Sequence, residues 1–444
     1  MVIMVPPAVE QACAVLRAQG FQAYLVGGAI RDSLLGLVPT DWDIATDAVP
    51  EQVEAVFTRS LPTGKRFGTV TVFVHDTPIE VTTMRSDGPY SDQRRPDYII
   101  FTDQLELDLA RRDFTINALG YDPLAKRIID PFQGRKHLKR KILATVGDPS
   151  ARFREDPLRM LRLIRFQSTL GFKVHKDTER VLPSLAGLIA KVSPERMLAE
   201  LNKMLMGREL LSALETFAAS TLMEVVLPEL AACCGLCAGE HHPYDLLTHA
   251  CTAAHFAHPL LHLRWAALLH DVGKQRSLGR DHAELGASLA EQLLRRLRAS
   301  TELIAKVSAL ITHHMFDLHP HSSDRAWRRF LGRVGVEATR DLIKLRQADM
   351  AGMNASPRQI LAYGQAMEAR LNDILTQDSA LSLKDLRIDG RQLMQELDLQ
   401  PGPLVGQLLH YLLEQVWEDP ELNQRETLVR LAAEQLKCLR SNGL

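Results

Sequence analysis

The chain has 444 residues, of which 46% are hydrophobic and 24% are charged. This composition is typical of a globular protein of two to four domains. It excludes a disordered chain, a collagen or a coiled-coil rod as the main structure. Lysine plus arginine (53) balances aspartate plus glutamate (54), so the sequence does not indicate a nucleic-acid-binding protein that is basic overall.

The sequence also bears on the compartment. It has no apolar run near the ~18 residues that would span a bilayer. Its first twenty residues lack the basic and long apolar segments of a signal peptide. The six cysteines are unevenly spaced and do not form the pattern of a disulfide framework. We therefore expect a cytoplasmic protein that does not associate with a membrane.

Two residue types are unevenly distributed along the chain. Between Arg135 and Arg165 there are ten lysines and arginines against three acidic residues. Twelve of the sixteen histidines lie between His241 and His321. This distribution indicates two different chemistries in two parts of the chain.

The first part, residues 1–145, is predicted to be a small α+β domain. Helical periodicity favours helices, and β-branched runs favour strands. The expected helices cover 9–19 and 29–36, and the expected strands cover 21–26, 42–46, 68–74 and 79–84. Residues 85–106 are polar and contain proline, so a flexible loop is expected there. From Asp108 onward we expect helix, apart from a turn near 128–134.

The rest of the chain is predicted to be almost entirely helical. Helical periodicity runs through 159–172, 194–205 and 209–231. Residues 233–244 resemble a linker, and 381–390 resemble a second boundary. The expected domains after the first are a helical neck over 146–235, a histidine-rich helical domain over 240–376 and a helical tail over 377–444.

Gly27 and Gly28 follow an expected strand and precede an expected helix. Glycines at such a turn let a phosphate approach the backbone and the positive end of the helix. Arg31, one turn into the helix, can add a forked contact to phosphate oxygens. The alternative interpretation is an ordinary strand-to-helix turn.

Asp41-Trp42-Asp43 is expected to lie in a strand, so the carboxylates of Asp41 and Asp43, two residues apart, should share one face. Paired carboxylates beside a phosphate site suit one or two Mg²⁺ ions. Glu80, in another expected strand, is a candidate third carboxylate. The alternative for an isolated D-x-D pair is a solvated turn.

Asp113 and Asn117 are spaced i, i+4, which predicts neighbouring side chains on one helical face. Together they can hydrogen-bond ribose hydroxyls, while Arg112 reaches a phosphate. The alternative is a helix start with surface salt bridges.

Arg159, Arg162 and Arg165 recur every third residue in the basic segment, close to one helical face. Asp156 and Arg159 place an acceptor next to a donor, which complements the shared edge of cytosine and adenine but not that of uracil and guanine. A protein with this pair can select C and A without a nucleic-acid template. The structural alternative is that Pro157 begins a helix and Asp156 is its N-cap.

Several motifs in order then resemble one family. They are LVGGAIRDSLLG, TDWDIAT, RRDFTINALGYDP, DPFQGRKHL, REDPLRMLRLIRF and PERMLAEL, over roughly residues 20–205. This set resembles the class II tRNA nucleotidyltransferases and bacterial poly(A) polymerases. The resemblance implies a polymerase-β-like head with a mixed or antiparallel sheet, followed by a helical neck that reads the base.

The resemblance also implies residue roles. Gly28 and Arg31 would bind the triphosphate, and Asp41 and Asp43, with Glu80 less securely, would bind Mg²⁺. The nucleotide-binding positions would be Arg112, Asp156, Arg159, Arg162 and Arg165. The implied reaction adds nucleotides from CTP and ATP to the 3′ end of tRNA.

Alternatives within and outside the family remain open. Residues 85–101 resemble the loop used to switch from C to A addition. Because Asp92, Arg94 and Arg95 are present, full CCA addition or A addition is favoured over CC addition. The mixed-charge tail disfavours a poly(A) polymerase. A third alternative, an RNA-binding protein on an inactive transferase scaffold, is disfavoured by intact Asp41 and Asp43.

The histidine-rich region resembles the HD phosphohydrolase superfamily, because His270-Asp271 is flanked by further histidines and a distant Asp349. The resemblance implies that His249, His270, Asp271 and Asp349 bind a divalent transition metal. His282, with His313 or His314, would complete a second metal site or bind phosphate. This domain can be a phosphohydrolase or a retained helical support for tRNA.

Overall fold

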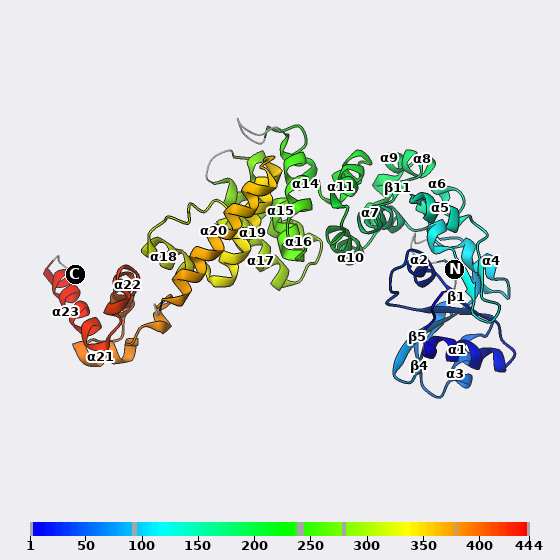
Figure 1. Ribbon diagram of the computed structural model, residues 1–444, viewed down its shortest axis with the longest axis horizontal. Coiled ribbons are helices and arrows are strands. Elements are labelled where there is room, and N and C mark those ends of the chain that lie inside the picture. Colours follow the sequence, from blue (N-terminus) through cyan, green and yellow to red (C-terminus); the bar gives the residue numbers. More distant parts are fainter. Residues whose placement is uncertain (1–2, 91–95, 238–243, 278–280, 378–379, 442–444) are drawn as a thin grey trace. The chain divides into compact units, whose positions relative to one another are not determined.

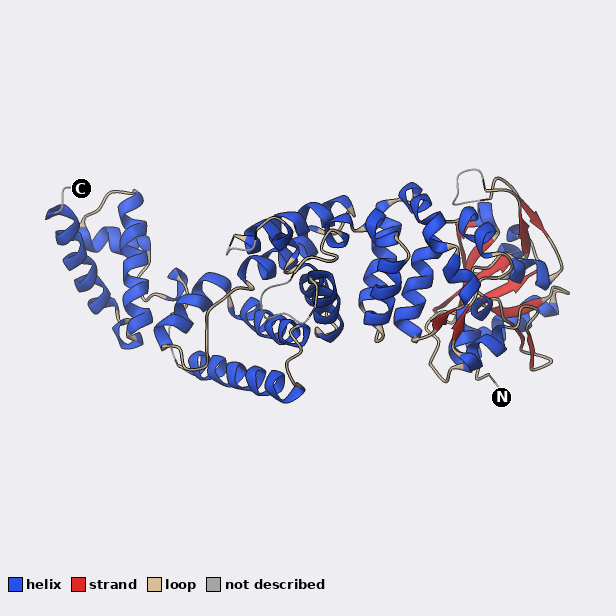
Figure 2. Ribbon diagram, turned by 90° about the horizontal axis from the view of Figure 1, so that it is seen from above, coloured by secondary structure: helices blue, strands red, loops and turns tan. Residues whose placement is uncertain are grey.

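The computed structural model describes residues 3–90, 96–237, 244–277, 281–377 and 380–441. The chain forms two compact units, residues 1–232 with 296–299 and residues 233–295 with 300–444. Within the described ranges, all strands lie before residue 175 (red in Figure 2). This confirms the prediction of an α+β N-terminal part followed by a helical remainder. The finer division into four domains stays a prediction.

The first unit begins with a mixed sheet whose seven described strands run in the order β3-β4-β5-β2-β1-β8-β9. β2 and β5 are parallel, and the other neighbours are antiparallel. Alternate residues of β4 are buried, as expected where helices α1 and α3 cover one face of the sheet (Figure 1). The strand bounds are β1 Ala23–Val26, β2 Asp43–Thr46, β3 Ser60–Gly64, β4 Thr69–Val74, β5 Thr77–Thr83, β8 Gly120–Asp122 and β9 Arg127–Ile129.

Short elements accompany this sheet. β6, which follows β5 in the chain, forms a separate antiparallel pair with β7. The helical and hairpin bounds are α1 Pro7–Ala18, α2 Gly28–Leu34, α3 Pro50–Val56, η1 Lys65–Phe67, β6 Arg85–Asp87, β7 Ile99–Phe101, α4 Leu105–Ala110 and η2 Thr115–Asn117.

Two expectations for this region are wrong. Residues 85–106 are not one loop, because they contain β6, β7 and the start of α4. The chain is not helical from Asp108 onward, because β8 and β9 follow α4. Both errors have one cause: β6 to β9 are three residues long, too short to show a two-residue period. β8 is stabilised by pairing with β1, far away in the sequence.

The remainder of the first unit is helical except for the two-residue strands β10 and β11. Helix α7 packs against α10 and α11, and its buried side chains include Leu161 and Ile164. This confirms the helical periodicity expected for 159–172. The bounds are α5 Gly134–Arg140, β10 Ile142–Leu143, α6 Pro149–Glu155, α7 Leu158–Leu170, β11 Lys173–Val174, α8 Lys176–Arg180, α9 Leu182–Leu185, η3 Ala186–Lys191, α10 Pro194–Leu205, α11 Leu210–Ala219, α12 Leu222–Val226 and α13 Pro228–Ala231.

The second unit is helical throughout its described residues. Helices α14, α15, α17 and α19 pack on one another, and α20 packs on α19. The bounds are α14 Leu246–Phe256, α15 Leu261–Leu269, η4 Val272–Gln275, α16 His282–Arg296, α17 Thr301–His313, α18 Asp324–Val334, α19 Val336–Gly352, α20 Pro357–Thr376, η5 Leu383–Asp385, α21 Gly390–Leu397, α22 Pro403–Glu418, η6 Pro420–Leu422 and α23 Arg425–Ser441.

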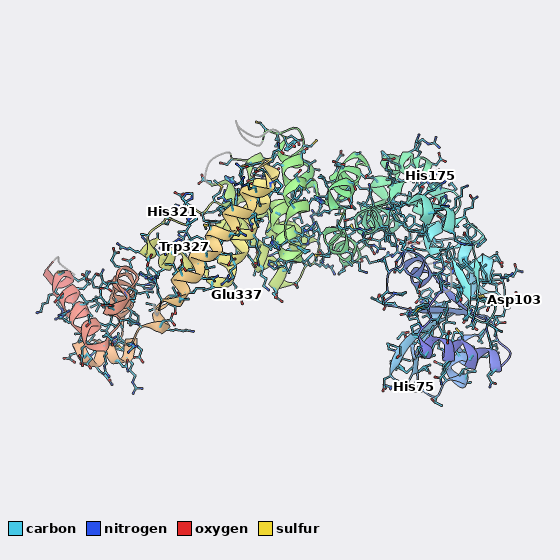
Figure 3. All side chains as sticks on the ribbon, viewed as in Figure 1. His75, Asp103, His175, His321, Trp327 and Glu337 are labelled. Carbon is cyan, nitrogen blue, oxygen red and sulfur yellow. The ribbon has the colours of Figure 1, made fainter. Side chains whose placement is uncertain are left out.

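Helix α18 connects the histidine-rich helices to the tail. Trp327 on α18 is fully buried, and its indole N–H donates to the carbonyl oxygen of His319 at 3.1 Å (Trp327 is labelled in Figure 3). Arg328, also buried, donates to the carbonyl oxygen of Trp417 on α22 at 2.8 Å. Leucines of α22 and α23, including Leu408 and Leu428, form an apolar core of their own. Among the described helices, none is long and apolar enough to cross a membrane.

Candidate functional site

The turn between β1 and α2 is closed by Gly27. Its φ of 78° lies in the left-handed region, which glycine adopts without strain. A Cβ at this position would lie 2.6 Å from Nη1 of Arg112 and 3.6 Å from Oδ2 of Asp43. The missing side chain therefore lets an arginine and a carboxylate approach the same point of the backbone. An ordinary strand-to-helix turn does not require that clearance.

Asp43 is the first residue of β2 and is paired with Val26 of β1 and Glu80 of β5. Directly paired residues of neighbouring strands project from the same face, so Asp43 and Glu80 share a face of the sheet. Asp41 precedes the strand, so the expectation that both aspartates belong to one strand is wrong. The reason is that β1 ends at Val26, where Gly27 turns the chain away and leaves residues 41 and 42 without that partner strand.

The three carboxylates influence one another. Burial raises the pKa of Asp43; Arg112 opposes this shift, and Asp41 adds to it. Burial, then Asp43 and Asp41, raises the pKa of Glu80. A divalent cation would relieve this mutual repulsion, and carboxylate oxygens are the ligands that Mg²⁺ prefers. The donor set therefore fits a magnesium site.

A second group of polar side chains lies beside Asp43 and is centred on Asp113. Nε and Nη2 of Arg162 donate to Oδ2 of Asp113 at 2.8 and 2.6 Å. Nδ2 of Asn117 donates to Oδ1 of Asp113 at 3.0 Å, and Oδ1 of Asn117 accepts from Nη1 of Arg31 at 2.7 Å. The expected proximity of Asp113 and Asn117 exists, but Asn117 lies in the 3₁₀ turn η2 and not on an α-helix.

This group is electrostatically fixed. Burial acts to raise the pKa of Asp113, but Arg162 and Asn117 outweigh it and hold that pKa well below its usual range. Asp113 therefore stays ionised at neutral pH. Its charge and hydrogen bonds join Arg31 of α2 to Arg162 of α7.

Asp156 lies between α6 and α7. Its Oδ1 accepts from the main-chain N–H of Leu158 at 3.2 Å, and its Oδ2 accepts from Nη2 of Arg196 at 2.8 Å. The helix begins at Leu158, one residue later than expected, with Pro157 as its N-cap residue. Asp156 still satisfies a backbone donor at this helix start, so the structural and functional interpretations of Asp156 are compatible.

Arg159 is one turn further along α7 and is 9% exposed. Its Nη1 donates to Oε2 of Glu155 at 2.7 Å, and its Nη2 donates to the carbonyl oxygen of Arg111 at 3.0 Å. The guanidinium of Arg159 is therefore held by the head domain as well as by the neck.

Arg162 and Arg165, the other two arginines of α7 in the three-residue repeat, both approach the ring of Phe166. The guanidinium carbon of Arg165 lies 3.7 Å from the centre of the Phe166 ring, and that of Arg162 lies 5.7 Å from it. Arg31 approaches the same ring to 5.2 Å. Glu200 of α10 is 2.6 Å from Nε of Arg165. Arg162 and Arg165 thus share contacts with Phe166 and Glu200, while Arg159 contacts Arg111.

One cavity of about 450 Å³ brings these groups together. Its lining residues are Gly28, Arg31, Asp43, Arg111, Arg112, Asp113, Asn117, Asp156, Leu158, Arg159, Arg162, Arg165, Phe166 and Arg196. Of the predicted residues of the head and neck, Gly27, Asp41 and Glu80 are not part of this lining. Gly27 directly precedes Gly28 in the chain, Asp41 lies two residues before Asp43, and Glu80 is paired with Asp43 in the sheet.

The sequence prediction missed Arg196. It belongs to the motif PERMLAEL, and its i, i+4 spacing to Glu200 was a usable signal. Arg196 contacts Asp156 just before α7, and Glu200 contacts Arg165 within α7. Arg111 was also missed as a lining residue, although it adjoins Arg112.

The second unit contains a separate cluster of histidines and aspartates. Among its described residues, two groups have their potential ligand atoms within 4.8 Å of one another: His249, His270 and Asp349, and Asp271, His282 and His314. All six are buried apart from Asp349, which is 14% exposed at its side chain. The structure includes His314 and not His313 in the cluster.

Asp271 lies between the two groups. Its Oδ2 is 3.3 Å from Nε2 of His270 and 3.5 Å from Nε2 of His249. Its Oδ1 is 3.5 Å from Nε2 of His282 and 3.6 Å from Nε2 of His314. One carboxylate thus faces both groups, so Asp271 would be within reach of a metal ion held by either group.

The cluster favours positive charge at its centre. Burial lowers the pKa of His270, but Asp271 and Asp349 outweigh burial and raise it to about 10. The pKa values of Asp271 and Asp349 lie well below their usual range: burial opposes this shift, and neighbouring histidines cause it. Nζ of Lys274 is 2.6 Å from Oδ2 of Asp271. Imidazole and carboxylate ligands suit divalent transition metals, so the donor set fits such ions.

Family models and known proteins are similar to this chain over most of its length. A model described as "Poly A polymerase head domain" matches residues 23–144. Models of an "RNA and SrmB-binding site of polymerase A" and of "tRNA nucleotidyltransferase domain 2" match residues 171–234 and 281–432. The CCA-adding enzyme of Bacillus stearothermophilus, solved in complex with CTP, superposes with a TM-score of 0.76 at 28% identity over 99% of this chain and 100% of that chain.

Curated relatives give the family. Alignments with three Geobacillus CCA-adding enzymes span 62%, 56% and 56% of those relatives, and the one from Geobacillus stearothermophilus is 44% identical over 265 residues, 59% of this chain. The CCA-adding enzyme of Ligilactobacillus salivarius is 32% identical over 428 residues, 95% of each chain. That of Bacillus subtilis is 33% identical over 93% of this chain and 94% of its own length. The chain therefore belongs to the class II CCA-adding enzymes.

Proposed function

We propose that this chain adds CCA to the 3′ end of tRNA, using CTP and ATP and no nucleic-acid template. One observation carries the proposal: Asp43, a carboxylate suited to metal-dependent phosphoryl transfer, lines the same cavity as Asp156 and Arg159, the pair suited to base selection. A cavity of about 450 Å³ with seven arginines in its lining suits a nucleoside triphosphate.

Asp41, Asp43 and Glu80 are the residues that would hold Mg²⁺. When bound, the cation supplies charge neutralisation on the triphosphate and favours ionisation of the attacking 3′-hydroxyl. The residues of the head then position the reactants, since phosphoryl transfer depends mainly on alignment and charge stabilisation.

The triphosphate is assigned to Gly28, Arg31, Arg112, Arg162 and Arg165. Gly28 leaves room at the backbone, and the arginines offer forked donors to phosphate oxygens. Asp113 and Asn117 are assigned to the ribose. Because they are hydrogen-bonded to Arg162 and Arg31, a ribose hydroxyl would enter a network that is already oriented.

Asp156 and Arg159 are assigned to the base. Asp156 can accept from the exocyclic amino group shared by cytosine and adenine, and Arg159 can donate to the adjacent ring nitrogen. Arg196 and the carbonyl oxygen of Arg111 hold the two side chains, so the selecting pair is fixed before the nucleotide enters.

A nucleotide-addition assay tests this proposal. A tRNA transcript that lacks CCA, given CTP and ATP, should gain C, C and A and then stop. With single nucleotides, CTP should be used first and ATP only after CC. A long A tail would favour a poly(A) polymerase, and addition of A alone or of CC alone would favour a partial enzyme. RNA binding without any addition would favour an inactive scaffold.

The loop that bears on this choice is only partly described. Asp92, Arg94 and Arg95, whose presence favours full CCA addition or A addition alone over CC addition, lie outside the described residues. The product of the assay therefore decides between CCA and partial addition.

In the second unit, Asp271 faces both groups of potential metal ligands, and this arrangement favours a second function. We propose that His249, His270, Asp271 and Asp349 bind a divalent transition metal, with His282 and His314 completing a second site. Such a site can act as a phosphohydrolase that repairs 3′ ends before nucleotide addition.

Metal analysis and a phosphatase assay test this second function. Purified protein should contain about two transition-metal ions per chain, given a pair of sites that share one carboxylate. The variant His270→Ala/Asp271→Ala should lose them together with any hydrolysis of a 2′,3′-cyclic phosphate. Unchanged metal content and hydrolysis in this variant would exclude the HD assignment. If the variant loses the metal and the parent protein shows no measurable hydrolysis, the site would be a structural metal site.

A further inference from the structure

A buried acidic residue lies behind the nucleotide cavity and has no assigned role. Asp108 is in α4, is 1% exposed and precedes the RRDFTIN motif. It does not line the cavity. A buried carboxylate is costly unless it is paired and hydrogen-bonded, so its partners indicate its role.

Those partners are two consecutive arginines of the cavity wall. Nε and Nη2 of Arg111 donate to Oδ1 of Asp108 at 3.0 and 2.7 Å. Nη2 of Arg112 donates to Oδ2 of Asp108 at 3.4 Å. Burial acts to raise the pKa of Asp108, but Arg111 and Arg112, with a contribution from the main chain of Arg85, lower it. Each oxygen of Asp108 thus holds a different arginine.

The two arginines contact different groups of the cavity wall. Arg112 reaches the backbone at Gly27, where Asp43 also approaches. Arg111 provides the carbonyl oxygen that accepts from Nη2 of Arg159 at 3.0 Å. Arg112 therefore lies on the side of the metal-binding carboxylates, and Arg111 supports the base-selecting arginine.

We infer that Asp108 is a positioning residue that fixes Arg112 beside Asp43 and, through Arg111, fixes Arg159 for base selection. This inference rests on the proposed nucleotidyl transfer. The carboxylate of Asp108 competes with that of Asp43 for the guanidinium of Arg112. The carboxylate of Asp43 therefore remains available to bind a cation. Without the charge of Asp108, Arg112 would pair more closely with Asp43, and the main chain at Arg111 would lose its anchor.

The variant Asp108→Asn separates this role from a general structural one. An amide offers one acceptor oxygen and turns its N–H donors toward the second guanidinium, so both arginines cannot be satisfied. The Mg²⁺ concentration for half-maximal CMP addition should rise about two- to tenfold, the range expected for losing one hydrogen bond. UMP addition relative to CMP addition should rise by a similar factor.

Asp122→Asn is the matched control. Asp122 lies in β8 of the seven-stranded sheet and is not part of the cavity lining. Its Oδ1 accepts from Nη2 of Arg17 at 2.8 Å. It should leave both measurements unchanged. If Asp108→Asn behaves like wild type, or if Asp122→Asn shows the same changes, the inference is overturned.

Asp108→Glu keeps the charge but moves the carboxylate by one methylene group. It should need nearly the wild-type Mg²⁺ concentration and still misincorporate UMP, because charge is retained and geometry is altered. Should Asp108→Asn fail to fold by circular dichroism, wild-type discrimination in Asp108→Glu would overturn the inference. A wild-type protein that adds no nucleotide would instead reject the proposed function itself.

Discussion

Nη2 of Arg196 lies 2.8 Å from Oδ2 of Asp156, so a side chain of α10 holds the carboxylate that we assign to base recognition. One helical turn further, Glu200 lies 2.6 Å from Nε of Arg165. Helix α10 therefore uses one face to orient both Asp156, just before α7, and Arg165 within α7.

We predict that Arg196→Met weakens base selection more than stability. Asp156 would lose its side-chain partner, so UMP addition relative to CMP addition should rise about two- to tenfold. The pair is partly exposed, and the free energy of unfolding should therefore fall by no more than about 1 kcal/mol. Single-nucleotide kcat/KM values and urea unfolding measure the two effects. An unchanged nucleotide ratio would remove Arg196 from the selection of the base.

The exchange of the base-selecting pair gives a second prediction. Asp156→Arg with Arg159→Asp reverses donor and acceptor, so preference should shift from C and A toward U and G. Competition between CTP and UTP on a tRNA lacking CCA measures the shift. The double exchange Arg17→Asp with Asp122→Arg, at a distant ion pair of the head, is the control and should not change preference. Retained C and A preference in the first variant would contradict the assignment.

The head carboxylates should differ in importance. Asp41→Ala with Asp43→Ala should lower the rate of nucleotide addition on the order of 10³-fold, comparable to losing a main transition-state stabilising group. Glu80→Gln should have a smaller effect, about tenfold, because Glu80 lies outside the cavity lining. A gel-shift assay should show that tRNA binding survives in both variants. Normal addition by the double variant would refute metal binding at this site.

The raised pKa of Asp43 gives a stability prediction. A carboxyl group whose pKa is raised on folding contributes stability that is fully present below the unfolded value of 3.8 and is lost as the pH rises through the folded value. At neutral pH without divalent ions, the ionised carboxylate is thus unfavourable. Asp43→Asn should raise Tm by roughly 1–2 °C in EDTA at pH 7.

Magnesium should reverse the order of the Tm values of the parent protein and Asp43→Asn. Added Mg²⁺ should raise Tm of the parent protein and not of Asp43→Asn, because ligands that bind the folded state stabilise it. The advantage of Asp43→Asn should also disappear below about pH 4. Differential scanning fluorimetry across pH, with and without Mg²⁺, provides both measurements. A lower Tm for Asp43→Asn in EDTA at pH 7 would contradict the predicted cost of the buried charge.

The histidine cluster should show a different pH dependence. The pKa of His270 is raised from 6.5 to about 10, so the stability from its protonated form is fully present below pH 6.5. In metal-free protein this stability is lost as the pH rises through about 10. Tm measured in a chelator should therefore fall by several degrees over that interval.

Two comparisons check the cause of that fall. His270→Ala should flatten the dependence between pH 6.5 and 10, because the titrating group is gone. Added Mn²⁺ or Co²⁺ should keep Tm high in the parent protein at alkaline pH, since a metal ion replaces the proton among the same ligands. A chelator-treated parent protein with a flat Tm over this range would contradict the charge assigned to the cluster.

Much of the fold could be predicted from local patterns. The β-branched residues of 69–74 and the helical periodicity of 159–172 identify elements whose buried faces repeat every second or every third to fourth residue. Strands β8 and β9 could not be predicted, because each is three residues long. Their stability comes from pairing with β1 and with each other.

The candidate site shows the same division. The sequence by itself determined which residue types occur at the site: the glycine turn, the carboxylates at 41 and 43, the arginines of α7 and the histidines around His270-Asp271. Their spacing follows from the chain, so motif reasoning could find them. The alternative helix capping of Asp156 was compatible with function, because one carboxylate oxygen contacts Leu158 while the other contacts Arg196.

The tertiary structure alone decided which of these groups act together. It paired Asp43 with Glu80 across parallel strands, placed Arg159 against Arg111 and set Asp271 between two groups of ligands. It also introduced Arg196, Glu200 and Asp108. Contacts between residues distant in sequence depend on how helices and strands pack in three dimensions, and linear spacing carries no information about that packing.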